Sequence, residues 1–166
     1  MFEWTGIKLL DDLDLLLVAS ASGIRTIQFD LHPIPEWQRN DRNPLLMEAA
    51  SQLRAYFAGQ LHEFQLPLDV DGTGFQKRVW GQVAAIPYGE TRSYLQISTA
   101  LGSPGAVRAV GAANGANPVP IVVPCHRVIG AHGKLVGYGG GLPLKKRLLE
   151  LEGAMTLPLA LRAPPR

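Results

Sequence analysis

The chain has 166 residues, of which 46% are apolar and 18% are charged, a composition typical of a globular protein with one or two small domains. No apolar run reaches about 18 residues, which argues against a membrane span. The apolar stretch 13–21 begins among aspartates, where a signal peptide would have basic residues. We therefore expect a cytoplasmic protein whose single cysteine stays reduced.

The net charge of +2 divides unevenly along the chain. Residues 1–72 hold 5 Lys/Arg against 11 Asp/Glu, which gives −6, whereas residues 73–166 hold 11 against 3, which gives +8. Two solvated surfaces can differ in this way by chance, but the basic half also holds the only cysteine. The asymmetry therefore favours a C-terminal part that faces a polyanion, with nucleic acid as the first candidate.

Residues 1–71 are predicted to form a small sheet-and-helix domain. Apolar residues alternate at 13, 15 and 17 and again at 27, 29 and 31, with a turn signal between them, which predicts a β-hairpin. A polar loop over residues 32–43 follows. Asn43 and Pro44 mark the start of a helix that Gly59 ends. Its predicted apolar face consists of Leu46, Ala49, Ala50, Leu53 and Phe57. We expect only a scaffold role for this domain.

A linker over residues 66–74 is predicted to lead into a second domain, residues 72–153. Its first helix is marked by apolar residues from Phe75 to Val83 and ends before Gly89. The remaining residues, 154–166, contain three prolines and are expected to form a poorly ordered tail.

Two short helices joined by a glycine turn come next. Ser93 is suited to cap a helix over residues 94–101, and Ser103 with Pro104 begins a second one that reaches about residue 114. This pattern is typical of a helix-turn-helix, although an ordinary helical hairpin has it too.

The second of these helices is predicted to present a nearly smooth face with one cation, Arg108. A helix that reads base sequence needs several long polar side chains in the major groove. A smooth face instead favours close approach to the sugar-phosphate backbone or the minor groove. We therefore expect DNA binding without sequence specificity.

The most informative stretch is residues 121–130, IVVPCHRVIG, which contains Cys125. It is predicted to be a short extended segment, and a lone cysteine there is often a simple core residue. The adjacent His126 and Arg127 favour a reactive thiol, because cations depress a thiol pKa. Neighbouring side chains on an extended segment point to opposite faces, so we expect His126 to reach the sulfur through a water, with a carboxylate orienting the imidazole. The four histidines and the cysteine are not spaced for a zinc site.

Two later features complete the pattern. Residues 137–141, GYGGG, lack the register of a dinucleotide fingerprint but allow backbone amides to approach a ligand. A final helix begins at Pro143, and Glu152 follows one turn after Leu148 on the border of its buried face. Glu152 is therefore the candidate carboxylate for His126, although a surface glutamate fits the same position.

The motif Pro-Cys-His-Arg-Val at 124–128 resembles the active-site signature of the O6-alkylguanine-DNA alkyltransferases, also called methylated-DNA–protein-cysteine methyltransferases. The resemblance extends over about residues 72–153, through IPYGE at 86–90, RAVG at 108–111, Asn117-Pro118 and GYGGG at 137–141. The N-terminal part resembles the family only loosely. The fold that this resemblance implies is α+β, with a small N-terminal sheet-plus-helix domain followed by a mostly helical C-terminal domain that carries a helix-turn-helix and the cysteine segment.

The resemblance also implies roles for individual residues. Cys125 is the alkyl acceptor, and Glu152 and His126 activate it. Asn117 is a hinge beside the thiol segment, although an Asx-turn explains it equally well. The remaining implied roles are DNA binding and nucleotide flipping for Arg108, Tyr94 and Ser103, and a guanine pocket walled by Val128, Tyr138 and Gly139. The family often has Ser at the position of Gly139, so the substrate range of this chain stays open.

These observations lead to one functional hypothesis and two rivals. The chain is expected to bind duplex DNA as a monomer, flip an O6-alkylated guanine out of the helix and take its alkyl group irreversibly onto Cys125, without metal or S-adenosylmethionine. One rival is a Cys-His hydrolase, which would turn over. The other is a non-catalytic alkylated-DNA-binding protein of the same family, which the presence of Cys125 disfavours.

Overall fold

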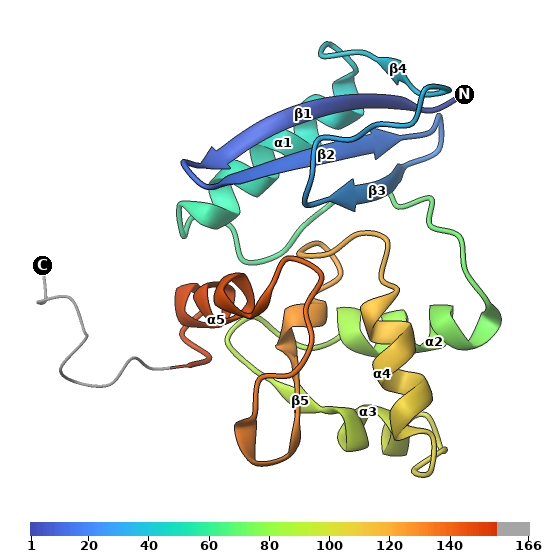
Figure 1. Cartoon of the computed structure of the whole chain (residues 1–166), viewed down its shortest axis with the longest axis vertical. Helices are drawn as coiled ribbons and strands as arrows, with labels where there is room; N and C mark the ends of the chain where they lie inside the picture. Colours follow the sequence, from blue (N-terminus) through green and yellow to red (C-terminus); the bar gives the residue numbers. More distant parts are fainter. Residues whose placement is uncertain (156–166) are drawn as a thin grey trace, which may run out of the picture.

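The computed structural model describes residues 1–155 and has the α+β fold that the sequence predicts (Figure 1). The N-terminal part is a four-stranded sheet with one helix. Strands β1 (Glu3–Leu10), β2 (Leu13–Ala19) and β3 (Ile24–Gln28) are antiparallel, and β4 (Gln38–Arg39) pairs in parallel with β1. The order in the sheet is β3-β2-β1-β4.

The predicted hairpin is present as β2 and β3, but its second strand is shorter than expected. It ends at Gln28, so Phe29 and Leu31 lie beyond it, and Leu31 is exposed. Phe29 leaves the sheet to contact the Tyr138 ring, at 5.6 Å between centroids. The short strand β4 lies inside the predicted polar loop, because a two-residue strand leaves no periodicity to detect.

Helix α1 (Pro44–Phe57) packs against β1 and β2. Its start follows the local chemistry, since the Asn43 side chain accepts hydrogen bonds from the amides of Leu45 and Leu46 at 2.9 and 3.1 Å. The predicted apolar face is correct except at its end, where Tyr56 is fully buried and Phe57 only partly.

The C-terminal part consists of short helices around the cysteine segment. These are α2 (Gly74–Ala84), α3 (Tyr94–Ala100), α4 (Val107–Gly115) and α5 (Leu142–Leu151). Thr73 and Ser93 cap α2 and α3 with complete capping boxes. Helix α4 begins at Val107, later than the predicted Ser103, because residues 103–106 form a turn in which the Ala106 amide donates to the Ser103 carbonyl.

The cysteine segment differs from the predicted extended strand. Residues 119–123 form a tight turn in which the Val123 amide donates to the Val119 carbonyl at 3.0 Å, and Ile121 has a φ of 73°. A 3-10 turn, η1 (Cys125–Arg127), and the short strand β6 (Val128–Ile129) follow. Strand β6 pairs with β5 (Arg92–Ser93), which ties the cysteine segment to the start of α3. A second 3-10 turn, η2 (Ala131–Gly133), lies beyond β6.

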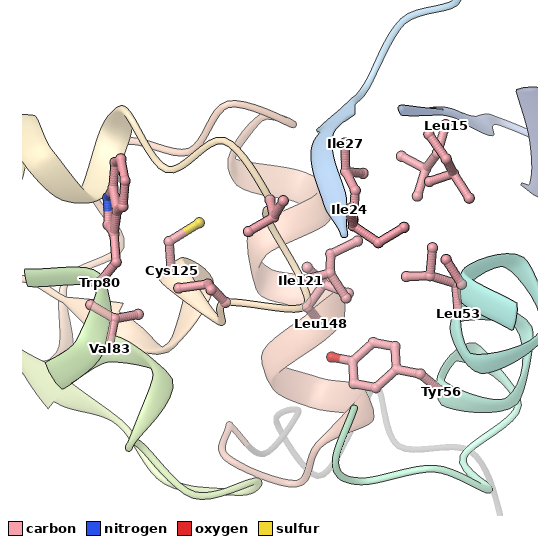
Figure 2. Packing of buried hydrophobic residues seen from close by; sticks show 14 of the residues in the cluster. Leu15, Ile24, Ile27, Leu53, Tyr56, Trp80, Val83, Ile121, Cys125 and Leu148 are labelled. Atoms are coloured by element: carbon pink, nitrogen blue, oxygen red, sulfur yellow. The ribbon is translucent and has the colours of Figure 1, made fainter. Parts of the chain in front are cut away.

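The two parts of the chain share one continuous core. Ile24, Leu53 and Tyr56 of the N-terminal part lie close to Ile121 and Leu148 of the C-terminal part (Figure 2). The predicted linker is bound to the sheet, since Ile24 exchanges backbone hydrogen bonds with Pro67 and Asp69. Of the predicted tail, residues 156–166 lie outside the described part of the chain. Across residues 1–155, none of the helices has both the length and the apolar character needed to cross a bilayer.

Candidate active site

A cavity of about 490 Å³ lies beside Cys125, between the cysteine segment and strand β3. This volume is in the range of sites that enclose a small ligand or a nucleobase. Its walls come from β3, from the inner face of α4, from residues 117–120 and from residues 137–139. Cys125 itself is 7% exposed, and Figure 2 shows its side chain between Trp80 and Ile121.

Most of the predicted site residues lie at the cavity or directly behind it, and three lie elsewhere. Cys125, Asn117, Tyr94, Tyr138 and Gly139 all line the cavity, and His126 and Glu152 lie directly behind it. Arg108 and Ser103 belong to α4 and the turn before it, outside the cavity. Val128 does not line the cavity, because its side chain is fully buried in the core and its carbonyl accepts a hydrogen bond from Lys145.

The buried carboxylate of Glu152 organises the charged groups of the site. His126 Nε2 lies 2.8 Å from its Oε1, and Arg127 donates from Nη2 to Oε1 and from Nε to Oε2, both at 2.9 Å. Arg127 also donates from Nη1 to the Ile86 carbonyl at 2.6 Å. Burial alone would raise the pKa of Glu152, but the bonds from His126 and Arg127 outweigh it and bring that pKa to about 2. Glu152 is therefore ionised throughout the physiological range.

The imidazole of His126 is held in one orientation by this carboxylate. Since Nε2 faces an ionised oxygen, it carries the proton, and Nδ1 is left with its lone pair. Nδ1 is buried and has no hydrogen-bond partner among the described residues. Burial lowers the pKa of His126, with Glu152 acting against this and Arg127 adding to it. A neutral imidazole of this kind can accept a proton at Nδ1 near neutral pH.

The electrostatics of the thiol differ from the sequence-based prediction. Burial raises the pKa of Cys125, and the Asn117 amide and the Lys145 ammonium oppose that rise. Arg127 was expected to activate the thiol, but its guanidinium binds Glu152 instead. The 3-10 turn also removes the strict alternation of an extended segment, so the geometry of His126 is set by η1 and Glu152.

Lys145 is the cation whose charge lowers the pKa of the Cys125 thiol, and sequence analysis did not single it out. It is fully buried in α5, and its Nζ donates to the carbonyls of Val128, Val136 and Gly137 at 2.7, 3.0 and 3.3 Å. Burial lowers its pKa, and the charge of Cys125 acts in the other direction. Because the hydrogen-bond partners of Nζ in residues 1–155 are neutral carbonyls, its positive charge remains available to favour a thiolate nearby.

Two asparagines hold the cysteine segment in place. Asn117 Nδ2 donates to the Val123 carbonyl at 2.8 Å, and Asn117 Oδ1 accepts from the Val119 amide at 3.0 Å. The Asx-turn and the tie between segments are therefore both present. Asn114 was not predicted, and its Nδ2 donates to the Cys125 carbonyl at 3.2 Å.

Tyr94 and Tyr138 place their phenols at the cavity wall. The Tyr94 hydroxyl donates to the Val136 carbonyl at 3.2 Å, and burial raises its pKa, with the Asn114 amide opposing the rise. Burial also raises the pKa of Tyr138 well above its usual value. Both phenols are therefore protonated at neutral pH, and the Tyr138 hydroxyl is buried without a hydrogen-bond partner among the described residues. Among residues 1–155, no group of three or more His, Cys, Asp or Glu side chains is placed to hold a metal ion.

Comparison with known proteins matches both parts of the chain to one family. Residues 74–154 match the family described as 6-O-methylguanine DNA methyltransferase, DNA binding domain, and residues 14–70 match 6-O-methylguanine DNA methyltransferase, ribonuclease-like domain. The methylated-DNA--protein-cysteine methyltransferase of Methanosarcina acetivorans is 47% identical over 145 residues, which cover 84% of this chain and 92% of the relative.

Mycobacterial proteins are more similar over a shorter stretch. The methylated-DNA--protein-cysteine methyltransferase of Mycobacterium bovis is 64% identical over 104 residues, and this match spans 63% of this chain and 63% of the relative. Among solved structures, Mycobacterium tuberculosis OGT in complex with DNA superposes with a TM-score of 0.81 at 46% identity, covering 92% of each chain. The structure of M. tuberculosis O6-methylguanine methyltransferase gives a TM-score of 0.84 and covers 97% of this chain and 99% of that one.

Proposed function

The chain belongs to the 6-O-methylguanine DNA methyltransferase family, and on that premise we propose that it repairs DNA by transferring the alkyl group of an O6-alkylguanine to Cys125. The observation that carries the proposal is the cavity of about 490 Å³ with Cys125 in its wall and the His126–Glu152 pair directly behind it. A nucleobase enters such a cavity only after it has been turned out of the duplex.

Thiol activation begins at His126. Its Nδ1 takes the proton of the Cys125 thiol through a bridging water, and the resulting imidazolium is stabilised by Glu152, which stays ionised because its pKa is about 2. Lys145 and Asn117 favour the thiolate from the other side. The chain therefore generates its nucleophile without requiring a metal.

Alkyl transfer is then an in-line displacement. The thiolate attacks the alkyl carbon, the bond from that carbon to the guanine oxygen breaks, and the electron pair stays with guanine. The phenol of Tyr94, which lines the cavity, donates a proton to the guanine ring, and the phenolate that results regains a proton from the His126 imidazolium through water, so that the net change moves the thiol proton to the base. The product is a thioether, which is not readily hydrolysed, so each molecule acts once.

The DNA-binding surface is proposed to be the helix-turn-helix of α3 and α4. Helix α4 has the sequence VRAVGAANG, and Arg108 is exposed on it. Small residues on this helix suit the minor groove and the backbone, whereas major-groove reading would need long polar side chains. Arg108 is proposed to take the place of the flipped base, and Ser103 to contact a phosphate. Binding is expected to be independent of base sequence.

Further properties of the protein are proposed on the same basis. The domain boundary is placed near residue 72, the protein is expected to act as a monomer, and its compartment is proposed to be the cytoplasm, where the free Cys125 stays reduced. Tyr138 and Gly139 are proposed to wall the guanine pocket from the side opposite α4.

Intact mass spectrometry after incubation with duplex DNA containing O6-methylguanine tests the function. We expect a stoichiometric gain of one methyl group, located on Cys125, and restored guanine in the DNA. Repeated turnover with unmodified protein would indicate a hydrolase, and binding without a mass change would indicate a non-catalytic lesion-binding protein. The Cys125→Ala variant is expected to bind the lesion duplex with normal affinity and to lose transfer completely.

A further inference from the structure

Tyr56 connects the N-terminal domain to the chemistry of the site. It lies in the last turn of α1, is fully buried, and donates from its hydroxyl to Glu152 Oε1 at 2.7 Å, across 96 positions of sequence. Figure 2 shows its ring reaching from α1 toward α5, with the oxygen at the tip. The rest of the ring packs on Phe57, Phe64 and Tyr88.

The carboxylate oxygen that Tyr56 binds is also the one that holds His126. Glu152 Oε1 is 2.7 Å from the Tyr56 hydroxyl, 2.8 Å from His126 Nε2 and 2.9 Å from Arg127 Nη2. Three donors around one oxygen share its negative charge and fix the plane of the carboxylate. The Tyr56 bond therefore limits how strongly Glu152 attracts a proton on His126.

Packing alone does not explain a tyrosine here. A phenylalanine would fill the same aromatic cluster, whereas a buried hydroxyl destabilises the fold unless it has a hydrogen-bond partner. The hydroxyl has one acceptor among the described residues, and that acceptor belongs to the group behind the nucleophile. The other ionisable groups whose charges act on this carboxylate or its neighbours are Tyr88, Tyr138 and Lys145.

We propose that Tyr56 is a positioning residue for alkyl transfer, which orients Glu152 and thereby sets the direction and the proton affinity of His126. This role rests on the proposed function and makes the N-terminal domain part of the reacting site. It gives residues 1–71 a role beyond the scaffold that the sequence predicts. Arg25 and Arg39 of that domain pair with Asp69 and Asp41 instead of Glu152.

Removing the hydroxyl has a defined consequence for the pH profile. In Tyr56→Phe, Glu152 Oε1 keeps only its bonds to His126 and Arg127, so more of its charge acts on the imidazole and the His126 pKa rises. The transfer rate falls at acidic pH because His126 must be neutral to accept the thiol proton. With a higher His126 pKa, this acid limb of the rate profile moves to higher pH. The carboxylate plane is also less constrained, and we expect the rate at pH 7.5 to fall about tenfold, which is 1.4 kcal/mol.

The test is single-turnover transfer from duplex DNA containing O6-methylguanine, measured between pH 5.5 and 9 with protein in excess. Tyr88→Phe is the matched control, because the Tyr88 hydroxyl donates to the Leu151 carbonyl at 3.3 Å and not to the carboxylate. We expect the rate loss and the shifted acid limb in Tyr56→Phe alone, with unchanged affinity for the lesion duplex.

A second substitution guards against a folding defect. Replacing Tyr56 by 3,5-difluorotyrosine keeps the hydroxyl and makes it a stronger donor, so the acid limb is expected to move to lower pH. A Tyr56→Phe profile identical to that of the wild type, or the same shift in Tyr88→Phe, overturns the positioning role. Failure of the wild type itself to gain a methyl group would instead refute the proposed function.

Discussion

Replacing Glu152 by Gln separates the charge of the buried carboxylate from its shape. Glu152 is 5% exposed, and its pKa falls from 4.5 to about 2 in the folded protein, because the bonds from His126 and Arg127 outweigh burial. The difference between these two pKa values is about 2.5 units, which corresponds to roughly 3 kcal/mol at 1.36 kcal/mol per unit. The ionised form is thus expected to stabilise the fold by about that amount at neutral pH.

A second route leads to a similar magnitude. Arg127 is buried, and its guanidinium donates to both carboxylate oxygens. Removing one partner of a buried ion pair typically costs about 3–5 kcal/mol, because the other charge is left uncompensated. We therefore expect Glu152→Gln to lower the free energy of unfolding by about 3 kcal/mol at pH 7.

The pH dependence gives the sharper test. Because the folded pKa lies below the unfolded one, the contribution of Glu152 is fully present above about pH 4.5 and is lost as the pH falls toward 2. Urea unfolding of both proteins, followed by tryptophan fluorescence at several pH values from 7 to 2.5, measures the difference directly. We expect a gap of about 3 kcal/mol at pH 7 that shrinks steadily below pH 4.5. A gap that stays constant down to pH 2.5, or no gap at pH 7, would refute this account of the site.

Three further predictions follow from the same geometry. Lys145→Met is expected to raise the pKa of the Cys125 thiol, so that the pH profile for its alkylation by iodoacetamide moves to higher pH than in the wild type. An unshifted profile would contradict the role of the Lys145 charge. Arg108→Ala is expected to slow transfer from duplex DNA about 10-fold or more while leaving transfer from a free O6-alkylguanine base unchanged, so equal losses on both substrates would argue against a role in flipping. Gly140→Ala is expected to lower stability by about 1–3 kcal/mol, because a Cβ there would lie 2.6 Å from Leu144 Cδ2 and also 3.0 and 3.1 Å from the rings of Tyr138 and Phe29, so that Leu144 has little room to move away. Gly139→Ala makes only ordinary contacts, and equal thermal shifts in the two variants would be inconsistent with this account.

Local chemistry made much of the fold predictable. Asn43 and Ser93 were recognisable as helix caps because a cap depends on residues within three positions. The predicted start of α4 was wrong because Ser103 and Pro104, which are typical of a helix start, instead form a turn before Val107. The turn at Ile121 was missed because a run of β-branched residues normally indicates extended backbone.

The site residues that belong to a recognisable motif could be predicted. Those that reach the site from other parts of the chain were missed. Cys125 and His126 stand together in a recognisable motif, and Glu152 was placed by its position after Leu148. Tyr56 gave no such signal, since helical periodicity shows that a residue is buried but not what its polar atom meets 96 positions away. Lys145 was missed for a related reason, because a lysine in an amphipathic helix is normally a surface residue.

The backbone conformation of Ile121 shows that the cysteine segment depends on its surroundings for its conformation. A branched residue with φ near 73° holds of order 1–3 kcal/mol of strain and persists only where its surroundings impose it. Part of those surroundings is supplied by β3, since the Thr26 hydroxyl and the Ile27 amide both donate to the Pro118 carbonyl, at 2.8 and 2.9 Å. We expect that removing β3 with the rest of the N-terminal half would let this loop relax toward ordinary extended backbone and would misplace the Cys125 thiol, even though every residue of its motif remained.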